Sequence, residues 1–440
     1  MSLTVCKFGG TSLADAAQIQ KVADIVHADL SRKFVVVSAP GKRFDTDSKI
    51  TDLLIDLREE KKASFEVNFE TIRSRFHGLV QELEVRVEID DEIEHLKVLT
   101  NLPIPDALVS RGEYICAKIV AVHLGFEFVD AASFIRFDKD GVFDLDATRR
   151  TWRHLHKPTA RGYVIPGFYG SLSNGEIKTF SRGGSDFSGA VVAAVVEADL
   201  CENWTDVSGM MCADPRVVKD PKVIPEITYR ELRELTYMGA SVLHDEVVFP
   251  LKEAGIPLRI KNTNAPEDHG TLIVPDHQAT PKENGAIVGI AGRKDFVVMT
   301  IEKPLMNQEI GFIANALGVF RDNGVSVEHV PGSIDAISVI VAADELKNGM
   351  LQKVRKDLVR VCGTDTIKVD EEVALICVVG HNMYHTPGTA ADILVSLAMA
   401  GVNTRIINQC VSELNIILGV DNNDYETAIL AIYQRAVLKQ

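Results

Sequence analysis

The sequence contains no paired-cysteine motif, although it has seven cysteines. They are scattered along the chain, their number is odd, and no two of them form a CxxC pair. This pattern disfavours both a disulfide framework and a zinc ribbon. We therefore expect a protein of a reducing compartment, the cytoplasm.

Export and membrane segments are also missing. The N-terminus has neither the basic start nor the apolar core of a signal peptide, so export by that route is not expected. The apolar run at residues 189–196 is interrupted by Glu197 and is too short to span a bilayer. We therefore expect no membrane among the partners of this chain.

Basic residues are outnumbered by acidic ones. With 47 Lys and Arg against 62 Asp and Glu, the net charge is −15, which disfavours nucleic acid as a partner. A small anion can still bind where a few cations and backbone N–H groups are gathered. The pattern GxxxxGK[ST] and a strand-linked GxGxxG are both absent, so a phosphate site must be of another kind.

The chain of 440 residues is long enough for about three domains. Its first part alternates short β-rich runs with helical patterns, beginning with an apolar run at residues 4–8 and a helical pattern at 12–30. This alternation predicts βαβ units around a mainly parallel sheet. The charged stretch at residues 58–98 keeps one apolar stripe and predicts a helical hairpin with a solvated face.

The last part of the chain repeats itself after a polar, proline-containing stretch at residues 264–284. One ungapped offset relates Gly311 to Gly388 and Gly324 to Gly401, together with several apolar positions. Each copy reads as strand, helix, two strands and helix. This order predicts a ferredoxin-like split βαβ arrangement in which a closing strand is still to be placed.

Two glycine turns lead from a strand toward a helix. In the first, Lys7 ends a buried strand and Gly9-Gly10 can direct backbone N–H groups at phosphate oxygens. The second, Arg182-Gly183-Gly184-Ser185-Asp186, precedes an almost wholly apolar helix. A turn and an N-cap explain either segment alone. Two such segments in one chain favour an anion site.

Two further segments carry polar residues at element ends. Thr205-Asp206-Val207 follows the strand at residues 200–204, and open α/β sheets hold ligands at the carboxyl ends of strands. Arg111-Gly112-Glu113 opens a helix. Its acid can accept a substrate ammonium group or simply cap the helix.

Together these segments resemble the aspartate kinase family, and the doubled C-terminal unit resembles its two ACT modules. The resemblance spans nearly the whole chain and is carried, in order, by Lys7-Phe8-Gly9-Gly10-Thr11, Val37-Ser38-Ala39-Pro40-Gly41, Arg111-Gly112-Glu113, Gly167-Phe168-Tyr169-Gly170, Arg182-Gly183-Gly184-Ser185-Asp186, Thr205-Asp206-Val207 and Asp214-Pro215-Arg216. It implies an α/β fold, an amino-acid-kinase-type mainly parallel sheet sandwiched by helices, followed by two ferredoxin-like α+β modules. The implied boundaries are 1–280 for the catalytic domain, and 281–370 and 371–440 for the ACT modules.

The resemblance implies an enzyme that phosphorylates the β-carboxylate of L-aspartate with ATP. Magnesium would bridge the ATP phosphates, so no metal cage of protein ligands is expected. An aspartate carboxylate is already ionised at neutral pH, so the reaction needs charge neutralisation and alignment rather than a general base. The implied catalytic residues are Lys7, on the transferred phosphoryl group, and Asp186, which would hold Lys7 by an ion pair.

The resemblance also implies two sets of binding residues. In the substrate set, Arg182 suits the α-carboxylate because its planar fork binds in a bidentate way, and Glu113 suits the ammonium group. The full substrate set is Ser38, Thr51, Glu113, Phe168, Arg182 and Ser185. The nucleotide set is Lys7, Gly9, Gly10, Thr205, Asp206, Met211, Arg216 and Lys261. Met211 stands where many members of the family have a tyrosine beside the adenine.

The ACT-like modules imply feedback control by an amino acid, with lysine as the expected effector, and a homodimer or homotetramer formed through them. Glu328 could pair the lysine ammonium group. The matching positions are Met306, Gly311, Phe312, Ile313, Ser326, Val327 and Glu328. A purely structural dimer interface is the alternative for these modules.

Two alternatives concern the whole chain. The first is a catalytically silent amino-acid sensor of the same fold. The charges of Lys7, Glu113, Arg182 and Asp186 favour the enzyme, because a sensor has no need of them. The second is a fusion with homoserine dehydrogenase, which we do not expect because the sequence ends directly after the second ACT-like unit.

Overall fold

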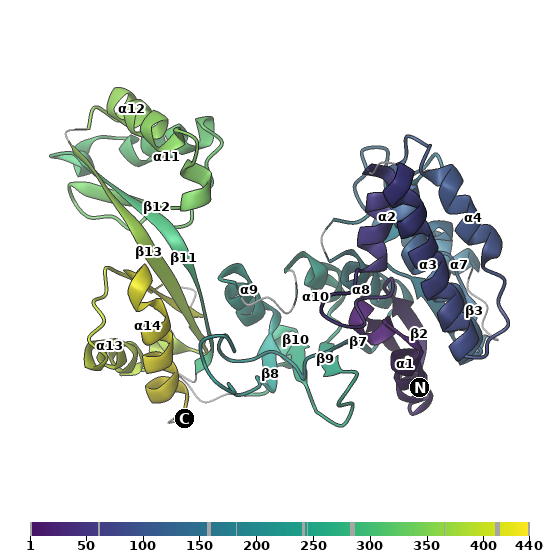
Figure 1. The fold of residues 1–440 in the computed structure, drawn as a ribbon. Helices are drawn as coiled ribbons and strands as arrows, with labels where there is room; N and C mark the ends of the chain where they lie inside the picture. Colours follow the sequence, from purple (N-terminus) through teal and green to yellow (C-terminus); the bar gives the residue numbers. More distant parts are fainter. Residues whose placement is uncertain are drawn as a thin grey trace. The chain divides into compact units, whose positions relative to one another are not determined.

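The structure is a computed structural model that describes residues 2–59, 62–155, 160–181, 183–239, 243, 245–281, 287–364, 366–409 and 414–438. The chain forms two compact units (Figure 1). The first consists of Met1–Met210, Val223–Leu232 and Ser241–Thr280, and the second of Met211–Lys222, Arg233–Ala240 and Pro281–Gln440. None of the described helices is long and apolar enough to cross a membrane.

An eight-stranded sheet organises the first unit, in the order β3-β4-β2-β1-β7-β9-β10-β8. Neighbouring strands are parallel except β9 and β10, which are antiparallel. The two central strands, β1 and β7, carry two of the predicted site residues, Lys7 and Thr205. The strands are β1 (Thr4–Phe8), β2 (Arg32–Val37), β3 (Glu127–Phe128), β4 (Tyr163–Pro166), β7 (Leu200–Thr205), β8 (Glu226–Thr228), β9 (Leu258–Asn262) and β10 (Thr271–Val274).

Helices cover both faces of this sheet. One face carries Cys6, Phe8 and Trp204 and packs into a core with residues of α1, α2, α3 and α6, whereas α8 lies against Lys7 on the other face. A short antiparallel pair, β5 (Tyr169–Ser171) and β6 (Ile177–Thr179), lies outside the main sheet. The helices are α1 (Ala16–His27), α2 (Ile50–Glu59), α3 (Lys62–Glu82), α4 (Asp90–Leu99), α5 (Pro105–Val109), α6 (Arg111–Leu124), α7 (Leu145–Leu155), α8 (Gly184–Val196) and α10 (Phe249–Ala254).

The predicted helical hairpin consists of α3 and α4. The stripe residues Phe69, Ile72 and Phe76 are buried, which explains why a helix with so many charges folds against this unit. A further helix, α9 (Tyr229–Tyr237), begins in the first unit and ends in the second.

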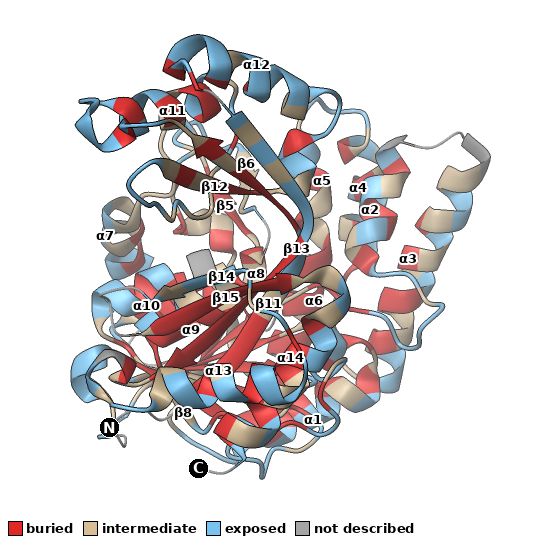
Figure 2. Cartoon of the chain, turned by 90° about the vertical axis from the view of Figure 1, so that its left-hand side faces the viewer, coloured by how far each residue is buried: buried red, intermediate tan, exposed pale blue. Residues whose placement is uncertain are grey.

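A five-stranded antiparallel sheet organises the second unit, in the order β12-β11-β13-β15-β14. The buried residues lie mainly on the central strands of this sheet, whereas many residues of α12 and α13 are exposed (Figure 2). The strands are β11 (Ile287–Glu302), β12 (Ala336–Ala342), β13 (Thr366–Gly380), β14 (Ile406–Gln409) and β15 (Asn415–Asp421). The helices are α11 (Phe312–Asp322), α12 (Met350–Cys362), α13 (Thr389–Met399) and α14 (Tyr425–Ile432).

The two long strands β11 and β13 each serve both repeats. The second half of β11 pairs with β12 and with residues 366–370 of β13, which close the sheet of the first repeat. Residues 287–293 of β11 pair instead with residues 375–380 of β13, beside β15, and so complete the sheet of the second repeat. The missing closing strands are thereby placed. The boundaries 1–280, 281–370 and 371–440 stay a prediction.

Candidate active site

Lys7 and Asp186 form an ion pair in the first unit. Lys7 lies in the central strand β1 and is only 7% exposed, and Asp186 lies in the first turn of α8. A Cβ atom on Gly189 would lie 2.9 Å from the Lys7 Cβ, so the glycine allows α8 to pack directly on this side chain. A buried ammonium group needs such a partner. The predicted ion pair is therefore present.

The glycine turn after β1 contacts the loop after β2. Gly9 donates its N–H to the Trp204 carbonyl at 3.0 Å, and Gly41 donates to the Gly10 carbonyl at 2.8 Å. The turn leads into a short 3-10 helix, Gly10–Leu13, rather than directly into α1. The reason is Asp15, whose side chain accepts the Gln18 N–H at 2.8 Å and so caps α1 about one turn later than the sequence pattern suggested.

Glu113 is a buried acid that forms no ion pair with any residue that the structure describes. Its side chain, in the first turn of α6, is 4% exposed and accepts a hydrogen bond from the Ala39 N–H. Its Oε2 atom has no hydrogen-bond partner among the described residues. Burial raises the pKa of this carboxyl group to about 8. A buried acceptor left without a partner is costly, so this position is suited to a bound cation.

The other predicted substrate residues lie around the loops at the same ends of the strands. Ser38 follows β2 and donates its N–H to the Phe8 carbonyl at 3.2 Å. Thr51 is the second residue of α2, and the Ile50 N–H bonds the Pro40 carbonyl at 3.3 Å. Ser38 therefore lies in the loop between β2 and α2 that meets the glycine turn, and Thr51 lies in the first turn of the helix that follows it.

Phe168 and Ser185 flank the junction between β4 and α8. Phe168 has φ +78, a strained value for a residue other than glycine, and its N–H donates to the Ser188 Oγ at 2.8 Å. A Cβ atom on Gly167 would lie 3.0 Å from the Ser185 Cβ, so this loop touches the start of α8. Arg182 lies outside the described residues.

Three of the predicted nucleotide residues gather at the carboxyl ends of β7 and β9. Thr205 ends β7 and donates its hydroxyl to the Asp206 carboxylate at 3.1 Å. Lys261 is the register partner of Trp204, lies 5.3 Å from its ring centroid, and donates to the Pro266 carbonyl at 2.7 Å. Burial lowers the pKa of Lys261. These ends lie beside Gly9, as expected for a ligand site of an open α/β sheet.

The remaining two nucleotide residues, Met211 and Arg216, belong to the second unit. The exposed Arg216 guanidinium is held by its neighbour Asp214, with Nη2 to Oδ2 at 2.6 Å and Nε to Oδ1 at 3.0 Å. The structure therefore does not gather these two residues with Thr205, Asp206 and Lys261 in one unit, and their nucleotide role stays a prediction. Within the described ranges, no three His, Cys, Asp or Glu residues are grouped to hold a metal ion.

Comparison with known proteins identifies the family. The amino acid kinase family matches residues 2–262, and the ACT domain matches residues 376–435. Over 449 residues the chain is 38% identical to Aspartokinase 3 of Bacillus subtilis, with 98% of each chain covered. The chain belongs to the aspartokinases. It is also 28% identical over 460 residues to the lysine-sensitive aspartokinase 3 of Escherichia coli, again with 98% of each chain covered.

Solved aspartokinase structures agree with the fold described above. Aspartate kinase of Clostridium acetobutylicum superposes with a TM-score of 0.89 at 43% identity, covering 99% of this chain and 100% of that one. Aspartokinase III of E. coli in complex with aspartate and ADP gives a TM-score of 0.76 at 25% identity, covering 99% of each chain. The predicted family, the fold class and the assignment as a kinase are thereby confirmed.

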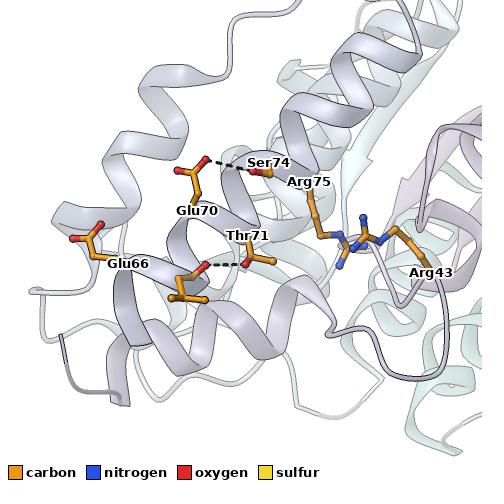
Figure 3. Close-up of a pocket in the computed structure, with 7 residues that line it drawn as sticks. Arg43, Glu66, Glu70, Thr71, Ser74 and Arg75 are labelled. Atoms are coloured by element: carbon orange, nitrogen blue, oxygen red, sulfur yellow. Dashed lines mark hydrogen bonds between the residues drawn. The ribbon is translucent and has the colours of Figure 1, made fainter. Parts of the chain in front are cut away.

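One residue that sequence reasoning missed, Arg75, ties together loops of this aspartokinase fold (Figure 3). It lies in α3, is 7% exposed, and donates to the carbonyls of Ser48 and Gly41, both at 2.7 Å, and of Ala14 at 3.3 Å. Figure 3 shows its side chain pointing toward Arg43. Both residues line a surface cavity of about 590 Å³. Arg75 follows Ile72 by three positions, so helical spacing alone places it on the buried stripe.

The predicted effector residues lie in the second unit, some of them buried in its core and others at its surface. Met306 and Phe312 are buried in the core of the first repeat, and Gly311, with φ +85, is the N-cap residue directly before α11. Ile313 is half exposed and Ser326 is exposed. Val327 and Glu328 follow Ser326 in the sequence. The backbone N–H of Glu328 donates to the Ile340 carbonyl at 2.9 Å. Sequence analysis did not find the partner of the Glu328 side chain, Tyr237.

Proposed function

We propose that the chain transfers the γ-phosphoryl group of ATP to the β-carboxylate of L-aspartate, forming 4-phospho-L-aspartate, the first step toward lysine, threonine and methionine. The observation that carries this proposal is Glu113, a buried carboxyl group in the same unit as the Lys7–Asp186 pair, whose Oε2 atom has no hydrogen-bond partner among the described residues. The E. coli relative in complex with aspartate and ADP supports it.

Charge neutralisation is the main task in joining two anions. Lys7 would stabilise the negative charge of the phosphoryl oxygens, while Asp186 orients its ammonium group. The Gly9 N–H is already bonded to the Trp204 carbonyl. The phosphate donors that we propose are therefore the N–H groups of Gly10 and Thr11, at the start of the 3-10 helix.

Recognition of aspartate would depend on its ammonium group. Binding of this cation to Glu113 replaces the proton that burial otherwise keeps on the carboxyl group. Arg182 is proposed for the α-carboxylate. Ser38, Thr51, Phe168 and Ser185 would surround the rest of the substrate.

Magnesium fits the donor set on the nucleotide side, where the exposed Asp206 carboxylate at the end of β7 can hold the ion through water. When bound, the ion would neutralise charge on the ATP phosphates. Thr205 would orient the Asp206 carboxylate through the hydroxyl bond described above.

The test is to trap the acyl phosphate with hydroxylamine. The protein with Mg-ATP and L-aspartate should form the hydroxamate, and Lys7→Ala should abolish it. Lys139→Ala, which removes an exposed lysine of the same unit, should leave the rate unchanged. A protein that forms no hydroxamate would contradict the proposal.

Feedback inhibition by lysine is the second part of the proposal. The solved E. coli structure with lysine and aspartate, at a TM-score of 0.75 and 25% identity, supports it. Lysine, threonine and S-adenosylmethionine should be titrated in the hydroxamate assay, and lysine is expected to inhibit. An unchanged rate and an unchanged KM for aspartate with all three would refute this part.

We also propose a homodimer or homotetramer formed through the ACT modules. The first repeat exposes several large apolar side chains in and near the loop before α11, which a partner subunit would cover: Leu305, Ile310, Ile313 and Ile334. Sedimentation analysis should give twice or four times the chain mass. Ile310→Asp should shift it toward the monomer, and a monomeric wild-type protein would refute the assembly.

A further inference from the structure

Asn203 lies beside Lys7 on the face of the sheet that α8 covers. The parallel register of β1 and β7 makes these two residues direct partners. Their neighbours Cys6 and Glu202 point to the opposite face, where the Cys6 thiol donates to the Glu202 carboxylate at 3.4 Å. Because successive side chains alternate between the faces of a strand, Lys7 and Asn203 share the other one.

The Asn203 amide is buried, and its oxygen has no partner among the residues that the structure describes. The residue is 6% exposed, and its Oδ1 makes no hydrogen bond in the part of the chain that the structure describes. Buried amide oxygens rarely stay without a donor, because desolvation is not compensated. The Lys7 ammonium is the neighbouring donor, and it has three N–H groups.

The charges of the catalytic pair also face this side of β7. Cys201 stands two residues before Asn203 and therefore on the same face. Burial raises the pKa of the Cys201 thiol; Glu202 and Asp186 add to this rise and Lys7 opposes it. The ion pair of Lys7 with Asp186 of α8, and the packing of Gly189 of α8 on Lys7, place both charges on the face that Asn203 shares.

We propose that Asn203 is a positioning residue of the phosphoryl transfer, whose amide oxygen accepts a second N–H of Lys7 when nucleotide is bound. Asp186 and Asn203 would then hold two N–H groups of the ammonium, and the third would face the transferred phosphoryl group. This inference rests on the proposed function. Small displacements of a catalytic group cost large factors in rate, so a second contact on Lys7 matters.

The test compares Asn203→Leu with Cys201→Ala, a buried change on the same strand and face. Asn203→Leu should lower kcat about tenfold, leave both KM values within twofold, and leave Tm unchanged or higher, because an unpaired polar atom is replaced by an apolar group of similar size. Cys201→Ala should show the reverse pattern: a lower Tm with kcat within twofold.

A second variant, Asn203→Asp, places a carboxylate beside the phosphates and should weaken Mg-ATP binding at least fivefold in calorimetry. This binding measurement does not depend on which acceptor is phosphorylated, so it separates failure of the inference from failure of the aspartate assignment. The inference is overturned if Asn203→Leu keeps kcat within twofold. It is also overturned if a folded Asn203→Asp binds Mg-ATP as tightly as the wild type. If Asn203→Leu does not fold, the binding measurement on Asn203→Asp alone decides the test.

Discussion

The carboxylate of Glu328 accepts a hydrogen bond from the hydroxyl group of Tyr237, the last residue of α9. Burial and this bond raise the pKa of Tyr237 to about 12. Glu328 is also the residue proposed for the ammonium group of the effector. An effector cation therefore has to compete with Tyr237 for the same carboxylate.

Removing that competitor should strengthen inhibition. Tyr237→Phe is expected to lower the lysine concentration for half-inhibition about three- to tenfold, within the range for the net contribution of one hydrogen bond, with kcat unchanged. Tyr425→Phe is the matched control, because it removes a hydroxyl that bonds the Gly292 carbonyl in the same unit. Equal half-inhibition in Tyr237→Phe and the wild type would contradict the competition.

Glu113 predicts a pH dependence of stability without ligands. Its pKa is raised to about 8 in the folded chain, above the ordinary value of a glutamate, so the folded state binds the proton more tightly than the unfolded state. The stabilisation is complete below about pH 4.5 and is lost as the pH rises toward 8. We expect Tm to fall by several degrees between pH 5.5 and 8.5.

The variant Glu113→Gln isolates this effect. It should reduce the fall of Tm over that pH range and, by removing the proposed partner of the substrate ammonium, raise the KM for aspartate at least tenfold. At pH 8.5, saturating aspartate should raise the Tm of the wild type part of the way back, but it should not raise the Tm of the variant. The same slope of Tm against pH in both proteins would contradict the role of Glu113.

Arg75 should matter for both stability and activity. Arg75→Met leaves the carbonyls of Ser48, Gly41 and Ala14 without their donor, and we expect a loss of about 3 kcal/mol in urea unfolding together with a lower kcat/KM. Arg73→Ala is the control, because Arg73 on the same helix is partly exposed and pairs only loosely with Glu94 at 3.8 Å. Equal losses of unfolding free energy and of kcat/KM in Arg75→Met and Arg73→Ala would contradict the role of Arg75 in holding these loops.

Gly41 should be intolerant of a methyl group. A Cβ atom there would lie 2.6 Å from the Gly10 carbonyl carbon, so Gly41→Ala should push the two loops apart and lower kcat/KM at least tenfold. Gly78→Ala in α3 has no atom within 4 Å and should instead stabilise the protein by about 0.5–1 kcal/mol. Hydroxamate assays and urea unfolding of both variants check this contrast.

Local patterns were enough to predict the alternating sheet and the repeated unit, because turns, strand ends and helix starts are encoded in short segments. The Lys7–Asp186 pair was implied only by the resemblance to the aspartate kinase family. Arg75 was missed because its partners are backbone carbonyls, which any sequence can supply. The Tyr237–Glu328 bond and the partnership of Asn203 with Lys7 were missed for another reason. Both depend on which distant strands and helices become neighbours, and composition does not determine that register.

The shared strands β11 and β13 make the two repeats inseparable as folding units. A chain cut between the repeats would leave the second without residues 287–293, and a chain from which residues 366–380 were removed would leave both without a central strand. The second unit should therefore unfold in a single cooperative transition, and its formation should wait for pairing between segments far apart along the chain. A change that disrupts β11 or β13 within one repeat should therefore also destabilise the other repeat.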